Sequence, residues 1–221
     1  MNAFLTLYRR ELALAWGRGG GALLACGFYA GVATLVPLAV GPDAERLGAV
    51  GPGVAWMALA LSALLSLERL YERDFEDGTL DLLALGPVPL AVVALAKGLA
   101  QWTAGGLPLA VVAPVAAMVL GAPVTLAPLT FAAALVGGLG FAMVGGMGAA
   151  LALGARRGGV LIAVVVLPLF CPPVIFGAGA IEAVAQGMDW TSGFALLAAY
   201  SLGALALCPF ATAAAIRNAL S

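Results

Sequence analysis

Long apolar stretches alternate with short polar segments along the whole chain. A helix needs about 20 mostly apolar residues to cross the roughly 30 Å hydrocarbon core of a bilayer. The pattern therefore predicts six transmembrane helices in one transmembrane domain, residues 1–221. We place them at about residues 22–40, 53–67, 98–120, 128–153, 160–170 with a continuation to 181, and 194–216.

Composition agrees with this all-α polytopic membrane fold. Of 221 residues, 63% are hydrophobic and 10% are charged, which leaves too little polar surface to cover a soluble globule. The net charge of -1 indicates no general attraction to nucleic acid.

Before the first span, residues 1–18 predict a helix that lies in the membrane interface. Apolar side chains gather on one face, and the charged residues Arg9, Arg10 and Glu11 fall on the other. The apolar face comprises Phe4, Tyr8, Leu12, Ala15 and Trp16. A cleaved signal peptide ending near Cys26 is the alternative, but the apolar stretch continues far past that cysteine.

The densest charge lies between the second and third spans. Leu67, Leu70, Tyr71 and Phe75 fall at helical spacing, so the first half predicts an amphipathic helix. Its other face carries residues spaced for i,i+3 ion pairs, namely Arg69, Glu72, Arg73 and Glu76.

Asp77 and Gly78 end this first helix. Thr79 is expected to cap a second short helix, with Asp81 in its first turn, which Gly86 and Pro87 stop. The product is a helix-turn-helix. One interpretation is a solvated connecting loop. Two apolar faces around a capped turn instead favour docking onto a soluble partner.

The third span is preceded by a helical piece, residues 90–97, whose Lys97 is expected to extend its ammonium group to water. Pro108 and Pro114 predict kinks within that span.

Small residues recur every fourth position in the fourth span, which lets helices approach closely in lipid. The stripe consists of Ala134, Gly138, Ala142, Gly146, Ala150 and Gly154. Its partner is either another span of this chain or a second copy in a homodimer; a substrate groove is less favoured.

After the fifth span, Cys171, Pro172 and Pro173 predict a break or a re-entrant hairpin at the outer end. Residues 181–190 then predict a short helix in the outer interface, so that 171–192 form an outer hairpin segment.

Basic residues are strongly biased to one side of this six-span arrangement. Nine fall on the side of both termini, and only Arg46 falls on the other. The positive-inside rule then places the termini and the charged segment in the cytoplasm. The nine are Arg9, Arg10, Arg18, Arg69, Arg73, Lys97, Arg156, Arg157 and Arg217.

The sequence lacks the groups that most chemistry needs. It has no phosphate-binding G-x-x-x-x-G-K-[ST] motif, no histidine, no C-x-x-C and no pair of carboxylates within a span. We expect no catalytic residues, no metal site and no cofactor bound by this chain. Met143 and Met147 could offer thioethers to a porphyrin iron, but packing is the favoured interpretation. A passive membrane body with a shaped polar segment suggests a permease subunit driven by a separate ATPase.

Four segments resemble the haem exporter protein B family, CcmB, within the wider ABC-2 (type V exporter-like) permeases. They are FEDGTLDLLALGPVPL at 75–90, AKGLAQW at 96–102, ARRGGVL at 155–161 and VLPLFCPPVIFGAGA at 166–180. The resemblance implies a multi-pass protein of the bacterial inner membrane that serves haem delivery for c-type cytochrome biogenesis. It implies partnership with the ATPase CcmA, which holds ATP and magnesium, with CcmC and CcmD, and indirectly with the haem chaperone CcmE. Haem is then a possible substrate, with its binding residues unknown.

The same resemblance implies that residues 68–97 form the coupling region. The expected ATPase contact comprises Glu68, Arg69, Glu72, Arg73, Phe75, Glu76, Asp77, Gly78, Thr79, Leu80, Asp81, Leu82 and Leu83. Gly78 would supply a tight turn, the acids would meet basic groups, and Leu80, Leu82 and Leu83 would fill an apolar groove.

Three functions remain open at this point. The chain could be a subunit that transports haem or drives release of the loaded chaperone. It could be a mechanical scaffold that transports nothing, or an ABC-2-like exporter of another hydrophobic substrate.

Overall fold

Nearly all of the described chain is helical, as the apolar stretches require. The computed structural model describes residues 3–17, 21–41, 43–67, 70–153 and 158–220. Its helices are α1 (Ala3–Gly17), α2 (Gly21–Val40), α3 (Ala44–Leu67), α4 (Glu72–Glu76), α5 (Thr79–Leu85), α6 (Leu90–Gln101), η1 (Trp102–Gly106), α7 (Leu107–Val119), η2 (Val124–Leu126), α8 (Ala127–Leu151), α9 (Gly158–Ala185) and α10 (Thr191–Ala219).

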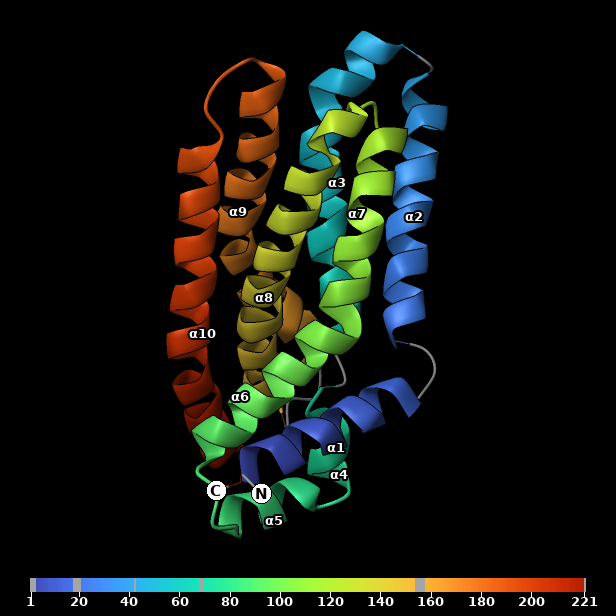
Figure 1. Cartoon of the computed structure of the whole chain (residues 1–221). Helices are drawn as coiled ribbons and strands as arrows, with labels where there is room; N and C mark the ends of the chain where they lie inside the picture. Colours follow the sequence, from blue (N-terminus) through green and yellow to red (C-terminus); the bar gives the residue numbers. More distant parts are fainter. Residues whose placement is uncertain (1–2, 18–20, 42, 68–69, 154–157, 221) are drawn as a thin grey trace.

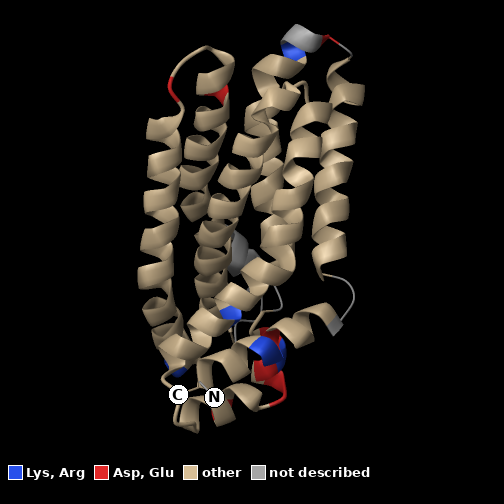
Figure 2. Ribbon diagram, in the orientation of Figure 1, with Lys and Arg blue, Asp and Glu red and all other residues tan. Residues whose placement is uncertain are grey.

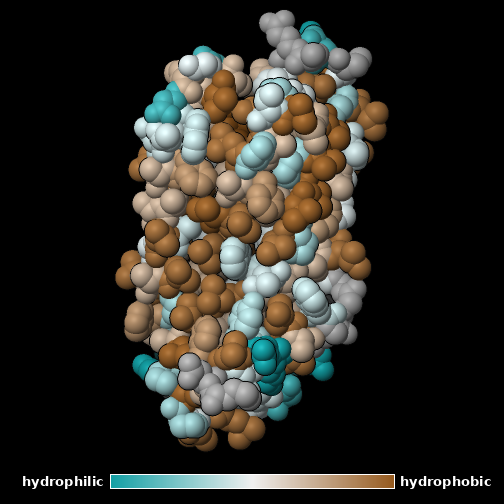
Figure 3. All heavy atoms as spheres, in the orientation of Figure 1, coloured by the Kyte–Doolittle hydropathy of each residue, from teal (hydrophilic) through white to brown (hydrophobic). Residues whose placement is uncertain are grey.

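Within the described residues, six helical segments are long and apolar enough to cross a membrane, which confirms the predicted number of spans. They run side by side, with α6, η1 and α7 together forming the third (Figure 1). On the face that Figure 3 shows, the most hydrophilic residues lie at the two ends and hydrophobic ones predominate between them. This distribution is the one a bilayer imposes.

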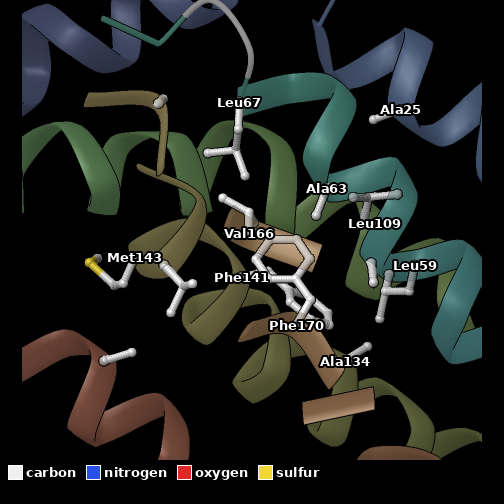
Figure 4. Packing of buried hydrophobic residues seen from close by; sticks show 14 of the residues in the cluster. Ala25, Leu59, Ala63, Leu67, Leu109, Ala134, Phe141, Met143, Val166 and Phe170 are labelled. Atoms are coloured by element: carbon white, nitrogen blue, oxygen red, sulfur yellow. The ribbon is translucent and has the colours of Figure 1, made fainter. Parts of the chain in front are cut away.

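Helix α8 lies at the centre and packs against α3, α7, α9 and α10. Its Phe141 ring stands 4.6 Å from the Phe170 ring of α9 and 6.5 Å from the Trp56 ring of α3, measured between centroids. Leu67 and Val166 complete this part of the core (Figure 4). The core therefore joins spans two, four and five.

The third span bends at η1, which is a π-helix (Figure 1). Pro108 lies just beyond it, lacks an N–H, and would clash with the Ala104 carbonyl in a regular α-helix. The wider π turn relieves this clash. The bend expected at Pro108 thus falls on Trp102–Gly106, which ends two residues before it.

The break expected at Pro172 and Pro173 is wrong, because α9 is one helix from Gly158 to Ala185. Pro173 has no N–H for the carbonyl of Leu169, but the Tyr200 hydroxyl on α10 donates to that oxygen. The prediction of a separate interfacial helix at 181–190 is also wrong. Its first five residues end α9, and Gly187 with φ of 71° reverses the chain.

The second span also begins earlier than expected. Helix α3 starts at Ala44 rather than near residue 53, so Arg46 lies in its first turn and not in a loop. Arg46 pairs there with Asp43, at 3.3 Å between Nε and Oδ2. Both termini lie at the opposite end of the bundle, where α1, α4 and α5 are found (Figure 1).

Candidate functional site

Charge gathers at the end of the bundle that holds both termini (Figure 2). Here α4 and α5 form a bent segment, residues 70–89, which we call the elbow. The first of its two predicted helices is shorter than expected. Leu70 and Tyr71 form a turn, and α4 has five residues. Glu68 and Arg69 lie outside the described residues.

The turn between α4 and α5 is closed by Asp77 and Gly78. Gly78 has φ of 74°, a left-handed conformation that glycine adopts without steric cost. The Asp77 carboxylate accepts the backbone N–H of Thr79 at 2.9 Å. Hydrogen bonds from the Thr79 side chain and backbone lower the pKa of Asp77. The N-cap of the second helix is Gly78 rather than the expected Thr79, which is its first helical residue.

Helix α5 presents an apolar pair to solvent. Leu82 is 72% exposed and Leu85 is 87% exposed. Leu80 is fully buried inside the chain, so its expected contact with a partner is wrong; Leu83 is half-buried. Sequence reasoning placed Leu85 on this helix but did not select it. Its i,i+3 spacing from Leu82 was the available signal.

Other exposed residues of the elbow are charged. The acidic residues Glu72, Glu76, Asp77 and Asp81 all face solvent, as does Arg73. Between the described residues of α4 there is no ion pair, so the predicted Arg73 and Glu76 pairing is absent. An elbow that exposes both an apolar pair and several acids is suited to a partner surface that carries leucine-sized pockets and basic groups.

Beneath the elbow lies a buried ionic cluster. The Lys97 ammonium donates to Glu11 Oε2 at 2.7 Å and to Asp74 Oδ2. The exposed fractions of these side chains are 1% for Lys97, 8% for Glu11 and 7% for Asp74. Arg10 contacts the other oxygen of Glu11, also at 2.7 Å, and the Tyr71 ring lies 5.6 Å from the ammonium.

This cluster corrects two expectations. Lys97 does not reach water, and Glu11 does not belong to the exposed face of α1. A lysine inside an apolar helix must either snorkel or find a carboxylate. Lys97 lies seven residues after the start of its 30-residue helical run. From that position the sequence alone does not show which of the two occurs.

The small-residue stripe of α8 lies inside the chain. Gly138, Ala142, Gly146 and Ala150 are all buried, and Gly154 is outside the described residues. A Cβ on Gly138 would stand 3.7 Å from the Trp102 ring. The closest contacts between α8 and neighbouring side chains occur at three other glycines. Gly137 packs against Trp56, Gly145 against Leu67 and Gly148 against Val166.

A pocket lies between α3, η1 and this stripe. Its free volume of about 20 Å³ suffices for about one water molecule and not for a porphyrin. Ser66 and Gln101 supply its polar atoms. The described residues contain no group of three or more His, Cys, Asp or Glu placed to hold a metal. Met143 is buried in the core, against Gly98 of α6.

These features define a polytopic α-helical membrane protein with a structured polar elbow at one end. A model of the family described as CcmB protein matches residues 2–219. The chain belongs to this family.

Named relatives extend along the whole chain. Heme exporter protein B of Paracoccus denitrificans is 47% identical over 208 residues, which cover 94% of this chain and 95% of that protein. The protein of the same name from Bradyrhizobium diazoefficiens is 42% identical over 221 residues, covering 100% of both. The one from Escherichia coli K12 is 40% identical over 214 residues, covering 97% of each.

Proposed function

We propose that this chain is the permease subunit of an ABC-type complex that serves haem delivery in c-type cytochrome biogenesis. Membership of the CcmB family supports the assignment, as does the name heme exporter protein B carried by its relatives. In this proposal the chain is not an enzyme. ATP and magnesium are held by a separate subunit, CcmA. CcmC and CcmD complete the membrane complex, which acts on the chaperone CcmE.

The observation that carries the mechanism is the exposed pair Leu82 and Leu85 on α5. Two exposed leucines have a higher free energy in water than when they are buried. A groove on the ATPase would bury them, and the exposed acids of the elbow would orient the encounter. Closure of the ATPase would then push on the elbow.

A second candidate is that force rather than haem passes through this chain, and the small pocket beside α8 is compatible with it. A pocket with room for about one water cannot admit a porphyrin in the described conformation. The chain would then act as a mechanical scaffold that drives release of loaded CcmE. Vesicles containing the purified complex and internal haem separate the two candidates. ATP-dependent appearance of haem outside indicates transport, whereas chaperone release without it indicates the scaffold.

Replacement of both Leu82 and Leu85 by glutamate tests the elbow contact. We expect co-purification with the ATPase to fall at least about tenfold, because each new carboxylate would lose its hydration in the groove. Met188→Glu is the matched control, since Met188 is 56% exposed and lies between α9 and α10. The control should retain the ATPase, and both proteins should insert normally. Full retention by the double variant would refute the proposed contact.

A further inference from the structure

Lys97 joins three segments that are distant in the sequence. It lies on α6, Glu11 on α1 and Asp74 on α4, so separations of 86 and 23 residues are bridged by one ammonium group. Asp74 is the elbow's charged link to this cluster. Whatever moves α4 therefore acts directly on α6 and α1.

Further polar contacts extend this link toward the bend of the third span. The Tyr8 hydroxyl of α1 lies 2.8 Å from the Thr103 hydroxyl of η1. Gln101, the last residue of α6, donates to the carbonyl of Ser66 on α3 at 3.1 Å. Helix α1 is thus bonded to α6 through Glu11 and to η1 through Tyr8.

Burial makes the cluster selective for one arrangement. A buried charge without its partner is costly, so α1 and α4 must stay where both carboxylates reach the ammonium. An apolar contact would tolerate sliding, because it has no directional requirement. The cluster thus defines the orientation of α4 relative to α6 more narrowly than the leucine contacts of the elbow could.

We propose that Lys97 is the positioning residue of the elbow. With Asp74 and Glu11 it holds α1, α4 and α6 in one fixed arrangement beside η1. Lys97 needs no contact with the partner for this role. The inference rests on the proposed function, in which the elbow receives force from an ATPase.

The test variant is Asp74→Leu, which releases the elbow but leaves Lys97 paired with Glu11. Glu182→Leu is the control, because Glu182 is an exposed carboxylate near the end of α9 and lies outside the elbow. In the complete complex we expect D74L to bind the ATPase within about threefold of wild type, yet to support about tenfold less cytochrome c maturation. A productive orientation reduced to a minor population lowers activity in proportion. The control should match wild type in both measurements.

A structural readout separates positioning from a general loss of stability. Spin labels are placed at Thr6 of α1 and Glu76 of α4, both exposed, in a background where the three cysteines are alanine. Asp74→Leu should broaden the distance distribution between them. A reference pair at Leu35 of α2 and Leu196 of α10 should stay unchanged.

Two outcomes overturn the proposal. One is an unchanged Thr6 to Glu76 distribution in D74L, and the other is full maturation despite a broadened one. If D74L does not accumulate, the triple variant Glu11→Gln, Asp74→Asn and Lys97→Met, which removes all three buried charges together and leaves only the part-exposed Arg10 without its partner, is judged by the same criteria. Failure of the wild-type chain to bind an ATPase would refute the proposed function instead, while the spin-label pair would still test the role of Lys97.

Discussion

Trp56 occupies a slot made by glycines, and this contact leaves no room for a methyl group. A Cβ on Gly177 of α9 would stand 2.2 Å from Cζ2 of the indole. Gly177→Ala should therefore lower stability by about 1 to 3 kcal/mol, the usual cost of overpacking. Gly179→Ala on the same helix is the control, because its Cβ would meet nothing within 4 Å. Thermal unfolding in detergent, followed by size-exclusion chromatography, measures both. Equal midpoints for the two variants would contradict the described packing.

Single residues also show where sequence reasoning stops. The sequence reveals Lys97 as an isolated cation among apolar neighbours, but its partner Glu11 lies 86 residues away. Leu80 and Leu82 are chemically alike, yet one is fully buried and the other 72% exposed. Only the path of the chain decides such differences. The candidate elbow and its Leu82 could be predicted, whereas the buried anchor and the burial of Leu80 required the structure.

At the scale of the element, α9 stays helical because a neighbouring helix replaces a missing donor. The Tyr200 hydroxyl donates to the Leu169 carbonyl that Pro173 leaves without its usual N–H. Tyr200→Phe should cost about 1 kcal/mol, the typical net value of one hydrogen bond. In a Pro173→Ala background the same change should cost less than about 0.5 kcal/mol, because the backbone N–H that the substitution restores then reaches the carbonyl.

Unfolding of the four proteins of this double-mutant cycle in mixed micelles gives the coupling free energy directly. Additive effects of the two changes would show that the hydroxyl does not compensate for the proline. Pro173→Ala alone is the internal control, and it should leave the helix content by circular dichroism unchanged.

The same element explains which helices were predictable. The bounds of α2 and α10 follow closely from hydropathy, since a bilayer demands an uninterrupted apolar length. The predicted break in α9 failed because proline was considered without Tyr200, which is 31 residues from Leu169. No hydrophobic pattern in the sequence distinguishes the π-helix of the third span from an α-helix. Pro108 indicates only that an irregularity lies near it.

At the scale of the whole molecule, charge is distributed unequally between the two ends. Among the described basic residues, those of α1, α4, α6 and the end of α10 share the end that holds the termini, and Arg46 lies at the other (Figure 2). The positive-inside rule then predicts that the elbow faces the cytoplasm. Single cysteines at Asp81 in the elbow and at Met188 in the opposite connection, in a cysteine-free background, test this prediction. Both positions are exposed.

A membrane-impermeant maleimide added to intact spheroplasts should label the Met188→Cys protein and leave the Asp81→Cys protein unlabelled. Permeabilisation should label both equally, which controls for thiol reactivity. Labelling of Asp81→Cys in intact spheroplasts would reverse the orientation. That result would also refute the ATPase contact, because ATP is available only on the cytoplasmic side. An outward elbow could receive no force from its hydrolysis, however well Leu82 and Leu85 matched a groove.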